Sequence, residues 1–297
     1  MEDLATLIAE IGADRESGAS EIVQRAIDVL GRVMLRPPQE RLQVARAICH
    51  AQPGMAPIWN AALAAMADDG SQTGFERFVR RVRRAPAALS RVTCEVFSDP
   101  DARKPDALSI VTISSSASVR QGLAAIARAR PLRVACAEGR PAFEGRRMAS
   151  ALADAGAAVT LFSDAAIAEA LHDANAILVG ADAVASDWFM NKVGTRMLAA
   201  AASLCGVPVY VVASRDKFCA PTLAAFIIPR DGVRAEIWDA PPRGIVVRNP
   251  YFERVPMDLV TGIITDAGLM PSASVKPFCE SLAAASPIEA VERLALP

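Results

Sequence analysis

Apolar residues in the first hundred positions recur at intervals of three and four, which is the spacing of amphipathic helices. The pattern covers 4–11, 22–30 and 42–49, and a further helix is predicted over 74–91. Proline and glycine interrupt the pattern between these segments, as they commonly do where helices end. We therefore predict a helical N-terminal domain that comprises residues 1–100.

A different pattern follows a polar, proline-containing stretch at 98–106, which we predict to be a linker. Short apolar runs then alternate with helical stretches, so that strands and helices are expected in turn. The predicted strands are 108–113, 132–137, 158–162, 177–179 and 207–213, and the predicted helices are 120–129, 145–155, 165–173 and 192–205. Because such strands are joined by right-handed crossovers, we predict an α/β fold with a mainly parallel, doubly wound sheet in residues 101–297.

Two further apolar segments lie in the last third of the chain, at 198–213 and 288–294. The stretch 198–213 is shorter than the roughly 20 residues that span a bilayer, and Gly206 and Pro208 interrupt it. We interpret it as a helix end, a turn and a buried strand. Ile288, Val291 and Leu294 predict a short amphipathic helix, which we expect to cover a subunit edge.

Composition excludes several classes of partner. The chain has 32 basic and 33 acidic residues and a net charge of −1, so no strong field favours nucleic acid or a membrane surface. Six cysteines lie far apart without a CxxC pair, and only two histidines are present. We therefore expect reduced thiols, a cytoplasmic protein and no metal site.

Three polar clusters follow predicted strands, where the ligand crevice of a doubly wound sheet lies. The first is Ser114-Ser115-Ser116, whose hydroxyl and backbone N–H groups at a helix start suit a phosphate or carboxylate. Plain helix caps are the alternative explanation for these serines. The second contains Arg140, which could clamp an anion or form an ordinary surface ion pair.

The third cluster combines an acid with a base. Asp182 follows the strand 177–179, and Asn191 and Lys192 are predicted to open the next helix. A carboxylate beside a lysine in an apolar crevice is a candidate general acid or base. A buried pair that only fixes a loop remains the alternative.

These clusters, in this order, resemble a known family. Its members are methylthioribose-1-phosphate isomerase, ribose-1,5-bisphosphate isomerase and the alpha, beta and delta subunits of initiation factor 2B. The resemblance extends from about Leu4 to Pro271 and is most specific in GADAVASDWFMNKVGT (180–195), VPVYVVASRDKF (207–218), EGRPAFEG (138–145) and VRNPYFERVPMDLVTGIITDAG (247–268). It implies a helical domain packed on a Rossmann-like domain, a site in the cleft between them, and a homodimer or larger homo-oligomer.

The resemblance also implies residue roles. In the isomerases a cysteine and an aspartate pass protons while an aldose 1-phosphate opens and becomes a ketose phosphate. Asp182 matches the aspartate, and Ser114 takes the place of the cysteine. Asn191 and Lys192 match substrate-binding residues, and Arg140 falls in the basic motif at a strand end. No cofactor is implied.

The chain departs from the isomerase pattern in the N-terminal domain as well. Ser17-Gly18-Ala19 stands where Arg-Gly-Ala is expected, and Gln52-Pro53 stands where Arg-Pro is expected. Both missing arginines are phosphate ligands in the isomerases, so we expect Gly18 and Gln52 at an altered anion site. A serine hydroxyl is also a far weaker acid than a thiol, whose ordinary pKa is about 8.5.

Three hypotheses remain at this stage. The chain is an isomerase of a phosphorylated pentose, a non-catalytic sensor of a sugar phosphate or nucleotide, or a protein whose polar clusters only fix loops. The first two share a phosphorylated small molecule as ligand.

Overall fold

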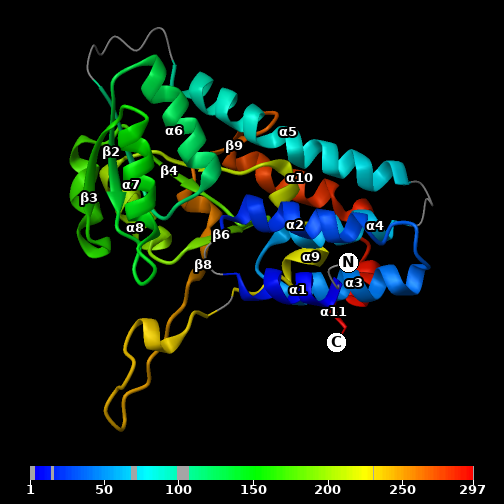
Figure 1. Cartoon of the computed structure of the whole chain (residues 1–297). Coiled ribbons are helices and arrows are strands. Elements are labelled where there is room, and N and C mark those ends of the chain that lie inside the picture. Colours follow the sequence, from blue (N-terminus) through cyan, green and yellow to red (C-terminus); the bar gives the residue numbers. More distant parts are fainter. Residues whose placement is uncertain (1–3, 15–16, 68–71, 99–106, 230, 297) are drawn as a thin grey trace.

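The chain forms a bundle of helices beside an α/β domain (Figure 1). This computed structural model describes residues 4–14, 17–67, 72–98, 107–229 and 231–296. The bundle contains α1 (Leu4–Ala13), α2 (Ala19–Gly31), α3 (Pro38–Ala51), α4 (Ala56–Met66) and α5 (Gln72–Val96). All four helices predicted from the periodicity of this region are present. Of the predicted linker 98–106, only Ser98 lies within the described residues.

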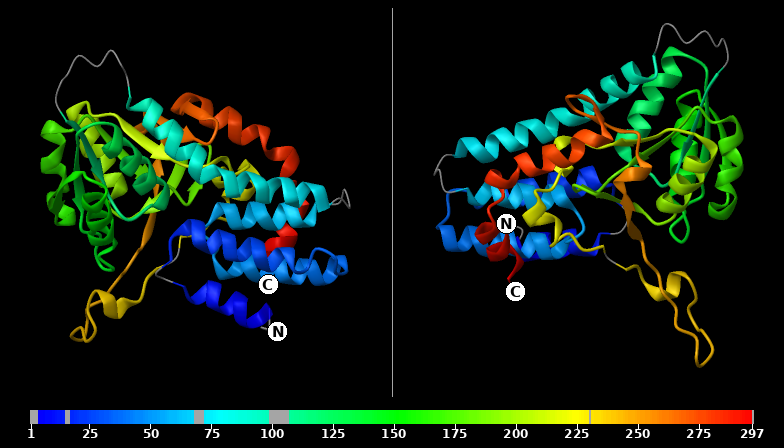
Figure 2. Two further views of the ribbon diagram at one scale, coloured as in Figure 1. Left: turned by 45° about the horizontal axis from the view of Figure 1, so that its top comes forward. Right: turned by 180° about the vertical axis from the view of Figure 1, so that it is seen from behind.

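Helix α5 is longer than the predicted 74–91 and connects the two domains. It packs against α4 in the bundle and against α6 (Ala117–Ala129) in the α/β domain. Figure 2 shows α5, in cyan, running from one domain to the other along one side of the molecule. Its apolar face is buried along the helix, from Phe75 and Phe78 to Leu89 and Val92, and tertiary packing of this kind supplies most of a helix's stability.

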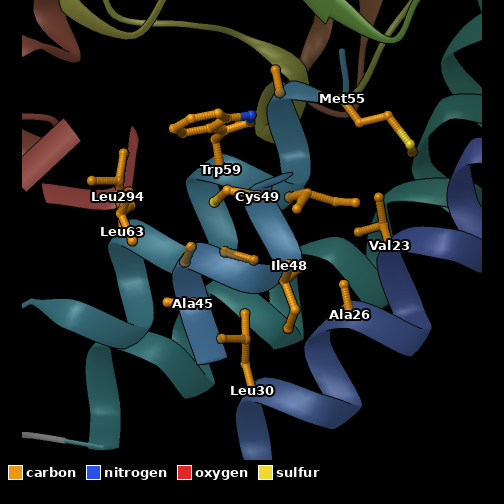
Figure 3. Close-up of a cluster of buried hydrophobic side chains, with 14 of the residues drawn as sticks. Val23, Ala26, Leu30, Ala45, Ile48, Cys49, Met55, Trp59, Leu63 and Leu294 are labelled. Carbon is orange, nitrogen blue, oxygen red and sulfur yellow. The ribbon is translucent and has the colours of Figure 1, made fainter. Parts of the chain in front are cut away.

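The C-terminal segment packs on the N-terminal bundle. The predicted amphipathic helix is confirmed as α11 (Ile288–Ala295), which contacts α3 and α4. Val291 and Leu294 are fully buried, and Figure 3 shows Leu294 beside Leu63 in the core of the bundle. A short amphipathic helix must bury its apolar stripe, and here the bundle rather than a subunit edge covers it.

A sheet of seven strands forms the centre of the α/β domain, and it is parallel except at one edge. Its strands are β1 (Leu108–Thr112), β2 (Leu132–Ala137), β3 (Ala158–Phe162), β4 (Ala176–Gly180), β7 (Val209–Val212), β9 (Gly262–Thr265) and β10 (Gly268–Pro271). They lie in the order β10-β9-β7-β4-β1-β2-β3, with only β10 antiparallel to its neighbour. The predicted mainly parallel, doubly wound sheet is confirmed, although the pattern did not reveal β9 and β10.

Helices cover the sheet, and most of them match the prediction. They include α6, α7 (Glu144–Asp154), α8 (Thr195–Cys205) and α10 (Val275–Ser281), whereas α9 (Pro221–Ala224) packs on the helical bundle. The predicted helix 165–173 is a 3-10 helix, η1 (Asp164–Asp173). Residues 198–213 form the end of α8, a turn at Gly206 and β7, as expected. No described helix is long and apolar enough to cross a membrane.

One prediction about the helix that starts at Lys192 is wrong. Asn191 and Lys192 end a strand, β6 (Trp188–Lys192), and α8 begins only at Thr195. Strand β6 pairs with β5 (Ala183–Val184) and β8 (Phe252–Pro256) in a small antiparallel sheet. The intervening Gly194 has φ of 97°, a left-handed conformation that stops the helix from extending backwards.

Candidate functional site

The strand order places a crevice between the ends of β1 and β4. After β1 the chain builds one half of the sheet through β2 and β3, and after β4 it builds the other half through β7 and β9. Loops on either side of this switch point diverge, which is why open α/β sheets bind ligands there. Ser114 to Ser116 follow β1, and Gly180 to Asp182 follow β4, so two of the three predicted clusters meet at this point.

Close packing holds the two loops together. Ser116 precedes α6, and its Oγ accepts a 3.5 Å hydrogen bond from the backbone N–H of Val119. A Cβ at Gly180 would lie 2.7 Å from the Cβ of Ser116, so only glycine fits there. Ser114 has φ of 69°, an uncommon conformation for a residue with a side chain, and one that is found at functional sites.

A cleft separates this crevice from the helical bundle. Its larger part, about 460 Å³, is lined by α2 and its start on one side and by the β1 and β4 loops on the other. A smaller part, about 120 Å³, extends towards Gln52 and Gly54. Asp182 and Tyr251 line both parts. We call the two parts together the interdomain cleft.

Asp182 lies where the two parts of the cleft meet. Its backbone N–H donates to Met190 O, and its carbonyl accepts from the N–H of Ala56 in the bundle, so both domains fix its position. Burial raises the pKa of the Asp182 carboxyl, and the nearby Lys217 ammonium opposes the rise. Lys217 is itself buried and donates to Ala181 O at 2.6 Å. A carboxyl whose protonated form is favoured in this way is suited to donate a proton.

A second acid lies beside Ser114. The Oε1 atom of Glu144 is 3.5 Å from Ser114 Oγ, which donates to it, and 2.6 Å from the Nζ of Lys192. Lys192 is 2% exposed, and its ammonium also lies 4.2 Å from the ring centre of Tyr251. Glu144 and Tyr251 line the cleft. The lysine predicted from the sequence to bind substrate is therefore paired with a glutamate that the sequence analysis did not select.

Two arginines and the first residues of two helices line the larger part of the cleft. The starts of α2, at Gly18 to Ser20, and of α6, at Ser115 to Ala117, line it together with Arg120 and Arg147. The first N–H groups of a helix have no partner within the helix and attract anions. Neither arginine was selected from the sequence, although Arg120 follows the serine cluster by one helical turn and Arg147 follows the EGRPAFEG motif.

Of the remaining predicted residues, Asn191 and Gln52 line the interdomain cleft and Arg140 does not. Asn191 is buried, lines the cleft and donates to Thr195 Oγ1 at 2.9 Å. Gln52 lines the smaller part and donates to Ile11 O at 2.7 Å. Arg140 is exposed, its guanidinium lies 4.9 Å from the centre of the Phe143 ring, and it does not line the cleft described above.

Candidate metal ligands do not gather in this cleft. Among the residues described, no group of three or more His, Cys, Asp or Glu side chains is placed to hold a metal ion. The groups that line the cleft are instead those of acid–base chemistry and anion binding.

Comparison with known proteins agrees with this architecture. A protein named ribose 1,5-bisphosphate isomerase from Archaeoglobus fulgidus is 26% identical over 91% of this chain and 90% of its own length. Methylthioribose-1-phosphate isomerase from Bacillus cereus is 37% identical over 45% of this chain and 41% of its own length. The crystal structure of translation initiation factor eIF-2B from Pyrococcus horikoshii superimposes with a TM-score of 0.76 at 25% identity, over 91% of this chain and 98% of that one.

The sequence model of one family covers most of the α/β domain and part of the bundle. The match extends over residues 43–272 and therefore includes every element of the crevice except the start of α2. The chain belongs to the initiation factor 2 subunit family.

Proposed function

We propose that this protein is an aldose–ketose isomerase that converts a phosphorylated pentose of the ribose 1-phosphate or ribose 1,5-bisphosphate type into a ketose phosphate. The observation that carries the proposal is the position of Asp182 and Ser114 in one cleft, beside two helix starts and two arginines. Relatives named as sugar-phosphate isomerases support a reaction of this class. An acid, a proton-accepting group and a phosphate site are the components that the reaction requires.

The reaction conserves all atoms and needs only proton and hydrogen movement. The C1–O4 bond of the ring breaks and O4 takes up a proton, while the C2 hydroxyl loses a proton and becomes a carbonyl. The hydrogen on C2 moves to C1. Asp182 is the proposed proton donor to O4, because burial raises its pKa and favours the protonated form. Ser114 is the proposed contact for the C2 hydroxyl.

Binding of the phosphate is assigned to the end of the cleft where α2 and α6 begin. The first backbone N–H groups of a helix favour an anion, and Arg120 and Arg147, which also line the cleft, add charges that can bind a phosphate in bidentate fashion. Arg147 in this way replaces charge that the chain lacks at Ser17. Asn191 is placed to bind sugar hydroxyls.

A non-catalytic sensor of a sugar phosphate or nucleotide is the second candidate. Ser114 in place of a thiol favours it, because an alcohol is a far weaker acid than a thiol. The chain is also similar to a crystallised translation initiation factor eIF-2B over nearly its whole length. A sensor and an isomerase share the ligand and differ only in turnover.

One experiment separates these functions. Purified protein is screened by thermal shift against ribose 1-phosphate, ribose 1,5-bisphosphate, methylthioribose 1-phosphate and nucleoside monophosphates, since a ligand of the folded state raises Tm. Every ligand that binds is then incubated with wild type and Asp182→Asn, and ketose formation is followed by NMR. Turnover that the substitution abolishes supports the isomerase. Binding without turnover by wild type favours the sensor, and no binding at all contradicts both.

We also propose that the protein is a homodimer. The segment 231–250 projects away from both domains (Figures 1 and 2), and Trp238 and Val246 on it are 47% and 79% exposed. Apolar side chains on a projecting arm favour burial against a second chain. Light scattering should give a dimer for wild type and a monomer for Trp238→Asp/Val246→Asp. A monomeric wild type would contradict the proposal.

A further inference from the structure

Ser114 is held next to a carboxylate rather than open only to the cleft. Its backbone, with φ of 69°, directs the chain from β1 into the loop before α6. Its Oγ donates to Glu144 Oε1 at 3.5 Å, while the residue itself lines the cleft. The hydroxyl is therefore positioned between the space for a ligand and a proton acceptor.

Glu144 is buried and firmly fixed. Only 8% of the residue is exposed, and it is the first residue of α7, where the helix dipole favours a negative charge. The next residue, Gly145, packs so closely that a Cβ there would overlap the carbonyl oxygen of Ala137. The start of α7 therefore lies directly against the end of β2, and the hydrogen bond that the Gly145 N–H donates to Glu138 O at 3.0 Å holds Glu144 beside Ser114.

Lys192 completes the arrangement. Its ammonium lies 2.6 Å from the same Oε1 atom that accepts from Ser114. The other carboxylate oxygen, Oε2, is buried and has no hydrogen-bond partner in the part of the chain that the structure describes. A buried carboxylate with one unsatisfied oxygen is costly, which indicates a role other than stability.

We propose that Glu144, oriented by Lys192, accepts protons through Ser114 and so allows a serine to act in this cleft. The inference rests on the isomerase function proposed above. The C2 hydroxyl proton passes to Ser114 Oγ as the Ser114 proton passes to Glu144, while Asp182 gives its proton to O4 and the C2 hydrogen moves to C1. Glu144 ends protonated and Asp182 ionised, and exchange with water restores both.

Kinetics of the Glu144→Gln variant test the relay. The amide keeps the shape but cannot accept the proton, so kcat should fall about 100-fold or more, the usual contribution of a general base. The Kd of the sugar phosphate should stay within about 3-fold, because the phosphate binds elsewhere in the cleft. Glu138→Gln is the matched control: Glu138 lies in the loop that leads into α7, but its carboxylate pairs with Arg146, and kcat should not change.

A thiol at position 114 should make the glutamate unnecessary. An ordinary thiol ionises near pH 8.5, far below an alcohol, and needs no carboxylate to accept its proton. At pH 8 the double variant Ser114→Cys/Glu144→Gln should therefore have a kcat at least tenfold higher than that of Glu144→Gln. Loss of both kcat and binding without this recovery would assign Glu144 a structural role and overturn the inference.

A second readout does not depend on turnover. Alkylation of the thiol introduced by Ser114→Cys is followed against pH by peptide mass spectrometry, with and without Glu144→Gln. The carboxylate disfavours a thiolate beside it, so its removal should lower the alkylation pKa by about 1 unit or more, whereas Glu138→Gln should not.

The two readouts distinguish the inference from the function on which it rests. Absence of turnover by wild type on every sugar would refute the isomerase, and the alkylation curves would still decide whether Glu144 controls proton transfer at position 114. An unchanged alkylation pKa, or a Glu144→Gln variant with wild-type kcat, would overturn the relay.

Discussion

Replacing Gly180 by alanine tests whether close contact between the β1 and β4 loops builds the crevice. Gly180 ends β4, and a Cβ there would lie 2.6 Å from Ser116 Oγ and 2.7 Å from Ser116 Cβ. The hydroxyl can rotate away, but the Cβ of Ser116 moves only with its backbone. The two loops must therefore separate.

The size of the effect follows from these distances. Carbon atoms in contact prefer a separation of about 3.5–4.0 Å, so the loops must move apart by roughly 1 Å. Overpacking of this kind typically costs about 1–3 kcal/mol. In a chain of this size each 1 kcal/mol lowers Tm by about 2–4 °C, so we expect Gly180→Ala to lower Tm by at least about 2 °C.

Tm is measured by calorimetry for Gly180→Ala, Ser116→Gly and the double variant. Removal of the Ser116 side chain removes the clash, so the double variant should be more stable than the sum of the single effects predicts. Gly31→Ala is the control, because its added Cβ would lie 4.0 Å from its nearest neighbour, Phe75 Cε1. That substitution should not lower Tm, because alanine at a helical position without a clash stabilises the fold slightly.

Additive effects in the double variant would refute this reasoning. They would show that Gly180 and Ser116 do not press on each other and that the crevice does not depend on their contact. A Gly180→Ala variant with wild-type Tm and wild-type ligand affinity would have the same meaning.

Three further predictions concern charge. Asp182→Asn should raise Tm at pH 7, because the pKa of this carboxyl is raised in the folded protein and its ionised form is disfavoured there. The gain in Tm should disappear as pH falls below the folded pKa towards about 4, while turnover should drop at least about 100-fold at all pH values. Arg147→Ala should weaken phosphate binding about 10-fold in a titration, whereas Arg146→Ala, which does not line the cleft, should leave Kd unchanged. Asp266→Asn should cost about 1 kcal/mol of stability at pH 7, because burial raises the pKa of Asp266 but hydrogen bonds from Arg215 outweigh burial and lower the pKa overall. The stabilisation is present above about pH 4 and is lost as pH falls through the folded pKa, so an equal Tm difference at pH 7 and pH 3 would contradict this prediction.

Local sequence patterns identified most of the scaffold. Apolar residues spaced for helices gave α1, α2, α3 and α5 but not α4, and short apolar runs gave β1 to β4 and β7, because burial on one or both faces imposes these patterns. Strand β6 was missed. Its residues are buried on both faces of a small sheet, and only Val193 and the left-handed Gly194 separate it from α8, so the segment resembles the start of a helix.

The sequence also indicated which polar side chains lie together in one cleft. Polar residues directly after strands, in a chain of alternating strands and helices, have to meet at one edge of the sheet. Ser114 and Asp182 line one cleft, as that argument predicts; Asn191 lines it too, but from within β6 of the small antiparallel sheet. Arg140 is exposed beside Phe143. Its role in binding stays a prediction.

By itself, the sequence determined the α/β class, most of the bundle helices and the alternating strands and helices from β1 to β4, and two of the loops that carry polar side chains. Only the tertiary structure brought Arg147 to the starts of α2 and α6, joined Lys192 to Glu144 and Ser114, and placed the C-terminal α11 in the N-terminal bundle. Periodicity reports which face of an element is buried. It does not report which distant element covers that face, because that choice depends on the packing of the whole chain.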